Sequence, residues 1–138
     1  MGDHRSVEDL HAPPALNHPP ASFELIMLFA VLTCVPSDTA QRELTAELHR
    51  LLAPGGVLYV SDLMLQTDDH HKDRYHRSPA GTPYGVFTTT DGAVCRHHDR
   101  EHLRGLLADF DLTAERRLEV PTMNGSRATA VQLLAHRR

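Results

Sequence analysis

Two short apolar runs, separated by a stretch of helical periodicity, limit the folds open to this 138-residue chain. Residues 23–29 and 57–61 are almost continuously apolar, as strands covered on both faces are. Between them, leucines recur at the spacing that places them on one face of a helix. These are Leu44, Leu48, Leu51 and Leu52. Strand, helix and strand in this order predict a βαβ unit whose two strands lie parallel.

Local signals set the expected ends of this helix. Ser37 or Asp38 can cap its first turn, because a short polar side chain accepts hydrogen bonds from the free amide groups there. Pro54-Gly55-Gly56 is expected to end it, since proline cannot continue a helix and glycine adopts the left-handed conformation of a helix cap.

The rest of the chain divides into segments of different character. Residues 1–22 hold two proline pairs and predict an irregular arm. The polar stretch 67–77 predicts either a solvated helix or an ordered lid. Asp99 is expected to cap a further helix. Residues 112–135 predict a closing hairpin, because Asn124-Gly125 between two strand-like runs is a strong hairpin signal.

Four segments resemble the carboxyl-terminal half of class I S-adenosylmethionine-dependent methyltransferases. Residues 47–62 resemble the family's junction of helix, L-x-P-G-G and fifth strand, and residues 21–26 resemble the start of its fourth strand, S-F-D-L-V. Residues 98–107 resemble the late helix before the last two strands, and residues 122–125 resemble a turn of one bacterial branch of small methyltransferases. Together the matches cover residues 21–136.

The resemblance implies an α/β fold that is a partial Rossmann-like methyltransferase fold. Strands 4 and 5 of the family would lie parallel, and strands 6 and 7 would form the antiparallel hairpin at the carboxyl terminus. The chain would then consist of a proline-rich arm over 1–22 and the carboxyl-terminal half of a methyltransferase-like domain over 23–138.

Most of the family's cofactor site has no counterpart in this sequence. In the family, a glycine-rich turn after the first strand and an acidic residue closing the second strand hold the cofactor, and neither is recognisable here. The resemblance therefore implies a truncated protein that is weak or inactive alone and that binds S-adenosylmethionine once the missing half is supplied. The one wall of the cofactor pocket that remains would be Phe29, Ala30, Val31 and Leu32.

A fourth strand without its expected neighbour leads to an alternative function. An apolar strand edge with unpaired backbone groups invites pairing with another chain. The chain would then be a non-catalytic methyltransferase-like module, and this strand would pair with a second copy in a homodimer or with a complementing amino-terminal half.

Candidate catalytic and substrate-binding residues come from the resemblance and from the rule that open α/β sheets bind ligands at the carboxyl ends of their strands. Asp62, which closes the fifth strand, is either a catalytic acid facing the cleft or a loop acid. His97 or His98 is a candidate general base, since imidazole titrates near neutral pH, although each can equally be a surface histidine. Tyr75 and Tyr84 either shape the acceptor pocket or pack the lid down.

Composition excludes several other classes of function. The net charge of −4 disfavours a nucleic-acid partner, so a small-molecule acceptor is expected. The longest apolar run, 25–35, is too short to span a membrane, and the amino-terminal residues contain no signal peptide. Cys34 and Cys95 are expected to be buried free thiols in a reducing cytoplasm.

The eleven histidines raise a metal-binding alternative. His98 and His102 are four residues apart, which is a helical metal-ligand spacing, but no cysteine or carboxylate completes a recognised ligand set. The sequence therefore predicts no metal site.

Overall fold

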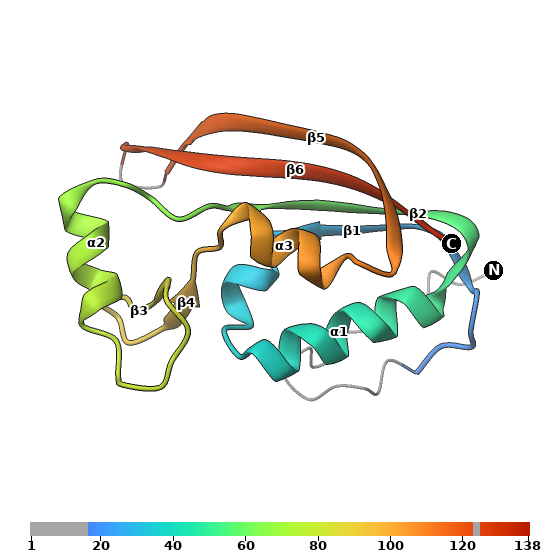
Figure 1. Cartoon of the computed structure of the whole chain (residues 1–138), viewed down its shortest axis with the longest axis horizontal. Helices are drawn as coiled ribbons and strands as arrows, with labels where there is room; N and C mark the ends of the chain where they lie inside the picture. Colours follow the sequence, from blue (N-terminus) through green and yellow to red (C-terminus); the bar gives the residue numbers. More distant parts are fainter. Residues whose placement is uncertain (1–16, 123–124) are drawn as a thin grey trace.

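The structure, a computed structural model, describes residues 17–122 and 125–138. Four strands form a mixed sheet in the order β1-β2-β6-β5 (Figure 1). Their bounds are Phe23–Phe29 for β1, Leu52–Leu63 for β2, Phe110–Pro121 for β5 and Arg127–Arg137 for β6. β1 and β2 are parallel, whereas β2 with β6 and β6 with β5 are antiparallel. The predicted α/β fold, with a parallel pair (strands 4 and 5) and a closing hairpin (strands 6 and 7), is confirmed.

The arm and the hairpin turn are described only in part. Residues 1–16 of the predicted arm lie outside the described residues, and so does Asn124 of the predicted turn. On either side of that turn, the Thr122 amide donates to the Ser126 carbonyl at 2.8 Å, and the Gly125 amide donates to the Thr122 carbonyl at 3.0 Å.

Two α-helices pack on the same face of the sheet, which Figure 1 shows edge-on with both helices below it. Their bounds are Asp38–Leu51 for α1 and Arg100–Leu106 for α3. Ser37 caps α1, because its Oγ accepts a hydrogen bond from the Ala40 amide at 3.2 Å. Asp99 caps α3 as predicted, accepting from the His102 amide at 2.7 Å.

The end of α1 differs from the prediction. The helix ends at Leu51, and Pro54-Gly55-Gly56 belongs to the irregular start of β2, where the register with β1 shifts. Gly55 has a φ of 76°, and a Cβ on Gly56 would lie 2.7 Å from the Ala53 carbonyl oxygen. The glycines are therefore required for the turn into the strand rather than for the helix cap.

Residues 64–98, which we call the lid, connect β2 to α3. They contain helix α2 (Asp69–His76) and a small hairpin of β3 (Val86–Thr88) and β4 (Val94–Arg96). The lid lies beyond the end of the sheet at which β1 and β2 finish (Figure 1). α2 is one of the two alternatives predicted for 67–77. β4 was not predicted, because a three-residue strand is specified by its partner rather than by its own pattern.

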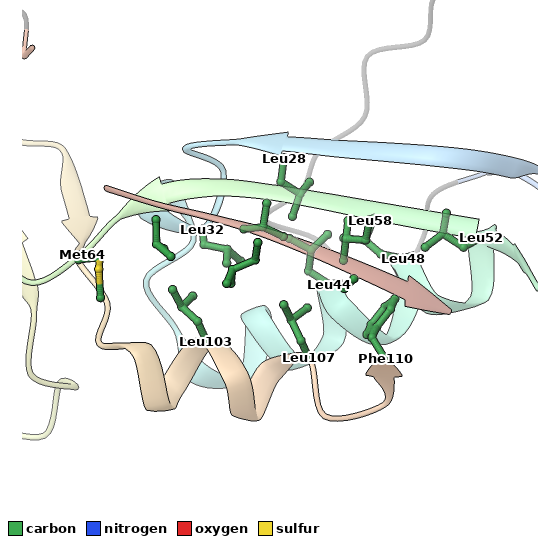
Figure 2. Packing of buried hydrophobic residues seen from close by; sticks show 14 residues of the cluster. Leu28, Leu32, Leu44, Leu48, Leu52, Leu58, Met64, Leu103, Leu107 and Phe110 are labelled. Carbon is green, nitrogen blue, oxygen red and sulfur yellow. The ribbon is translucent and has the colours of Figure 1, made fainter. Parts of the chain in front are cut away.

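The hydrophobic core lies between the sheet and its two helices. Figure 2 shows leucines of α1 and α3 pointing toward Leu28 of β1 and Leu58 of β2. Leu52 and Leu58 are fully buried. Complete burial of each such side chain stabilises the fold by about 1.5–3 kcal/mol.

The opposite face of β1 is bare. Leu25, Met27 and Phe29 are 53%, 53% and 61% exposed, while Ile26 and Leu28 alternate with them and face the core. The expectation that residues 23–29 are covered on both faces is therefore wrong for the described chain. The reason is that both α1 and α3 lie on the Leu28 face, and β1 has a single neighbour, β2, in the described sheet.

Two expectations from composition can also be compared with the structure. Cys34 is exposed and Cys95 is half-buried, so the prediction of two buried thiols is wrong; both are free. Within residues 17–122 and 125–138, no helix has the length and hydropathy that crossing a bilayer requires.

Replacing Gly56 by alanine tests the turn into β2. We expect G56A to lower the free energy of unfolding by about 1–3 kcal/mol, because its Cβ would press on a backbone oxygen that cannot easily move. Gly105 in α3 is the matched control: nothing lies within 4 Å of its Cβ position, and G105A should stabilise the protein by about 0.5–1 kcal/mol. Urea unfolding followed by circular dichroism measures both, and an unchanged G56A midpoint would contradict the argument.

Candidate functional site

The end of β1 is an exposed turn held against β2. Phe29 and Ala30 are exposed, and the Ala30 amide donates to the Ser61 carbonyl at 2.8 Å. Ala30 has a φ of 55°, a left-handed conformation that costs a non-glycine residue about 1 kcal/mol or more. Val31 is half-buried and Leu32 is 3% exposed. Of the four predicted cofactor-binding residues, Phe29 and Ala30 are therefore open to a ligand, whereas the Leu32 side chain belongs to the core.

A buried carboxylate ties this turn to the end of β2. Asp62 is 3% exposed, and its Oδ1 accepts hydrogen bonds from the Thr33 hydroxyl and, at 2.8 Å, from the Leu63 amide. Its Oδ2 accepts from the Thr33 amide at 3.3 Å. Burial raises the pKa of Asp62 above its ordinary value, and the hydrogen bonds from Thr33 and Leu63 oppose that rise.

Next to Asp62, three polar side chains from α1 and the start of α3 form a buried chain of hydrogen bonds. Gln41 Nε2 lies 3.2 Å from the Leu32 carbonyl oxygen and 2.9 Å from His98 Nε2. Gln41 Oε1 lies 2.7 Å from His102 Nε2. Because the amide nitrogen donates and the amide oxygen accepts, His98 carries its proton on Nδ1 and His102 carries its proton on Nε2.

His98 is the most buried ionisable group of this cluster, at 1% exposed. Its Nδ1 lies 3.8 Å from Asp62 Oδ1 and has no hydrogen-bond partner among the described residues. Burial first, and the positive charge of Arg96 second, lower the pKa of His98 to about 3. His98 is therefore neutral at pH 7, and it contacts protein groups rather than solvent.

His97 belongs to a second buried cluster, which lies within the lid. Tyr75 is 3% exposed; its hydroxyl accepts from the Gln66 amide at 3.0 Å and donates to His97 Nδ1 at 2.7 Å. Burial, followed by the charges of His71 and Arg74, lowers the pKa of His97 to about 4. Burial raises the pKa of Tyr75 to about 12, so both groups are neutral at physiological pH.

The structure therefore brings the predicted residues together as two adjoining clusters. Asp62 and His98 form one, Tyr75 and His97 form the other, and the peptide bond between His97 and His98 joins them. Tyr84 is 53% exposed, with its ring centroid 5.3 Å from that of Tyr75. The alternative prediction that His97 and His98 are surface histidines is wrong, since both are buried.

Three residues of these clusters, Thr33, Gln41 and Gln66, were not predicted from the sequence. Gln41 carried a detectable signal, because it lies three residues before Leu44 and so occupies the apolar face of α1; a buried amide there must find polar partners. Thr33 and Gln66 carried none, because their partners come from distant parts of the chain. Among the described residues, no group of three or more His, Cys, Asp or Glu side chains is placed to hold a metal ion.

Several solved structures with a similar arrangement of elements are methyltransferases. A SAM-dependent methyltransferase from Methanosarcina mazei matches with a TM-score of 0.85 and 23% identity, over 96% of this chain and 66% of that one. An S-adenosylmethionine-dependent methyltransferase from Mesorhizobium loti matches with a TM-score of 0.66 and 20% identity, over 94% of this chain and 67% of that one. The chain has part of a class I methyltransferase fold.

A third methyltransferase with this fold is the 1,6-didemethyltoxoflavin-N1-methyltransferase of Burkholderia thailandensis, solved with bound 1,6-didemethyltoxoflavin and S-adenosylhomocysteine. It matches with a TM-score of 0.61 and 19% identity, over 88% of this chain and 47% of that one. The chain thus spans about half to two-thirds of the length of these methyltransferases. No model of a protein family matches the sequence, and no curated protein is significantly similar to it.

The buried imidazoles predict acid sensitivity. The pKa values of His97 and His98, about 4 and 3, lie below the value of 6.5 expected in the unfolded chain. The contribution of the two neutral imidazoles to the free energy of unfolding is therefore complete above pH 6.5. It is lost as the pH falls toward their pKa values in the folded protein, because the unfolded chain then binds more protons. Between pH 7.5 and 5.5 we expect the free energy of unfolding to fall by about 2 kcal/mol.

Urea unfolding at both pH values measures this change in the wild type and in H98Q, H97Q and H76Q. Each buried-site variant should lose about half of the pH dependence, whereas H76Q, at an exposed position, should retain it. The raised pKa of Asp62 acts in the opposite direction in all of these proteins, so it cancels in the comparison. Equal pH dependence in all four would refute the assignment of neutral buried imidazoles.

Proposed function

We propose that this chain is the carboxyl-terminal part of an S-adenosylmethionine-dependent methyltransferase that acts on a small molecule in the cytoplasm. The observation that carries the proposal is the parallel pair β1–β2 followed by the β5–β6 hairpin, in a fold that matches solved methyltransferases. Its free thiols, Cys34 and Cys95, agree with a reducing compartment.

The exposed turn after β1 provides one wall of a cofactor site. S-Adenosylmethionine, when bound, supplies the methyl group on a sulfonium centre. The Phe29 ring is 61% exposed and can stack on a planar ring, and the left-handed backbone at Ala30 leaves the turn open to close approach. Because the residues of this wall that are open to a ligand, Phe29 and Ala30, carry no charge, the wall suits an adenine ring and leaves the charged end of the cofactor to another segment.

The buried clusters act in this proposal by positioning. Methyl transfer depends mainly on alignment of the acceptor with the methyl group, and a general base is an addition that only some acceptors need. Asp62 accepts a hydrogen bond from Thr33 and so holds the turn that follows β1. His98 is hydrogen-bonded to Gln41 and so orients the Gln41 side chain. Within the lid, His97 holds Tyr75 and so fixes α2 against the segment that leads into α3.

The acceptor is proposed to be small because of the space beside the lid. A cavity of about 400 Å³ lies between the start of α1 and the lid, lined by residues 36–39 on one side and by residues 81–83, 86 and 94 on the other. This volume is that of a small-molecule site. Tyr84, exposed on the same lid, is available to contact an acceptor, with Tyr75 packed behind it.

Binding of S-adenosylmethionine tests the proposal. We expect saturable but weak binding to the chain alone by isothermal titration calorimetry, strengthened when an amino-terminal methyltransferase segment is added in trans. F29A should weaken binding by about three- to tenfold, the equivalent of one aromatic contact. V120A, which truncates an apolar side chain of β5 at the other edge of the sheet, is the control and should bind as wild type does. Absence of saturable binding under both conditions would remove the proposal.

A second candidate function is a non-catalytic module that associates through β1. The observation that favours it is the combination of a strand edge without a partner among the described residues and three exposed apolar side chains, Leu25, Met27 and Phe29, on the same strand. A seven-residue edge of this kind has none of the lysines or prolines that usually prevent strand pairing. A second copy pairing antiparallel about a two-fold axis would cover the edge and would form a homodimer.

Light scattering after size exclusion distinguishes the two candidates. The module predicts a particle of twice the mass of one chain, and M27K should convert it to monomer because it places a charge on the bare apolar face. V94K on β4 adds the same charge at an equally exposed valine and should leave the dimer intact. A wild-type monomer at high micromolar concentration would eliminate association through β1.

A further inference from the structure

A basic cavity lies in the lid, apart from the two buried clusters. It has a volume of about 290 Å³, and its walls include His70, Arg74 and Arg77 on one side and the threonines at 88–90 on the other. None of its lining residues is acidic. The chain has a net charge of −4, so two arginines and a histidine in one cavity with no acidic residue in its described lining point to an anionic ligand.

Local structure explains why the basic residues converge. His70 and Arg74 are four residues apart on α2 and so share one face, and Arg77 caps the carboxyl end of the same helix one turn later. α2 packs against β3, which brings Thr88 at the end of this strand, and the two threonines that follow it, opposite the helix. The Ser78 hydroxyl donates to the Val86 carbonyl and holds the two walls together.

The two guanidinium groups are not neutralised. Elsewhere in the described chain most arginines form ion pairs with carboxylates. These are Arg50, Arg96, Arg100, Arg104, Arg127 and Arg138. Across residues 17–122 and 125–138, neither Arg74 nor Arg77 has an ion pair or a side-chain hydrogen bond, and Arg74 instead lies 5.3 Å above the Phe87 ring.

The acidic residues around the cavity have other orientations or partners. Asp69 and Asp73 each precede a basic lining residue by one position and are therefore turned about 100° around the helix from it. The Asp91 carboxylate accepts a hydrogen bond from the Thr89 hydroxyl. The hydroxyls of Thr88 and Thr90 form no hydrogen bond with another described residue, so they are available as donors.

We propose that this cavity binds the oxyanion group, a phosphate or a carboxylate, of a small molecule. Guanidinium groups present several donors in a fixed fork that matches such an anion, and hydroxyl donors on the facing wall complete its coordination. The proposal does not depend on methyl transfer. If the chain is shown to transfer methyl groups, the two cavities lie on the same lid. The basic cavity would then bind an anionic group close to the proposed acceptor cavity.

Phosphate titration of the full chain followed by NMR tests the site at pH 7.5 and constant ionic strength. Inorganic phosphate should shift amide signals of residues 70–90 with saturation. R77Q should weaken this binding about tenfold, because a charge-assisted hydrogen bond is lost from an exposed residue that supports no core contact. R117Q removes an equally exposed arginine on β5 and should leave the affinity unchanged. R77K should restore part of it.

Two further measurements make the outcome decisive. Circular dichroism of R77Q must match wild type, which separates lost binding from lost folding. Phenyl phosphate should bind more tightly than inorganic phosphate if the cavity serves an organic anion, and equally if it serves the free ion. Absence of saturable shifts, or equal weakening by R77Q and R117Q, would overturn the proposal, because the effect would then be absent or would report only net charge.

Discussion

The parallel pairing of β1 with β2 is the constraint on which the rest of the structure depends. Because α1 returns the chain to the end of the sheet at which β1 began, both strands run in the same direction and finish at the opposite end of the sheet. Thr33, which follows β1, and Asp62, near the end of β2, meet there although 29 residues separate them. The backbone of His98 then pairs with Leu63 and Leu65 beyond the same edge, so the start of α3 joins the site. An antiparallel β1 would have placed Thr33 and Asp62 at opposite ends of the sheet.

Burying polar side chains at this end of the sheet costs free energy, and hydrogen bonds compensate this cost only in part. Asp62, Gln41 and His102 have hydrogen-bond partners, whereas His98 Nδ1 and Arg96 Nε lack one among the described residues. Unsatisfied buried donors cost about 1–3 kcal/mol each. Groups retained at such a cost, at the edge where α/β sheets bind ligands, are more consistent with positioning a functional turn than with stabilising a core.

One face of the sheet is packed and the other is bare beside β1, and this asymmetry relates the two proposed functions. Leu28 and Leu58 face α1 and α3, while Leu25, Met27 and Phe29 face outward. In both proposed functions a further segment or a second chain would cover that side, so the bare face is common to them. What separates them is whether the covering segment also completes a cofactor site, and the exposed turn at Phe29 and Ala30 lies where such a segment would meet it.

The sequence by itself determined the order of the elements, the helix caps and the class of fold. Apolar runs, a Ser or Asp before a leucine repeat and an Asn-Gly turn are local signals, and local backbone preferences act on them directly. It also named Asp62, His97 and His98. Only the tertiary structure decided their environment, because burial depends on segments that are distant along the chain. Gln41 of α1 is hydrogen-bonded to His98, and Tyr75 of α2 is hydrogen-bonded to His97. The lid cavity has the same origin, since no spacing in the sequence reveals that a helix with two unpaired arginines packs against a strand that ends in threonines.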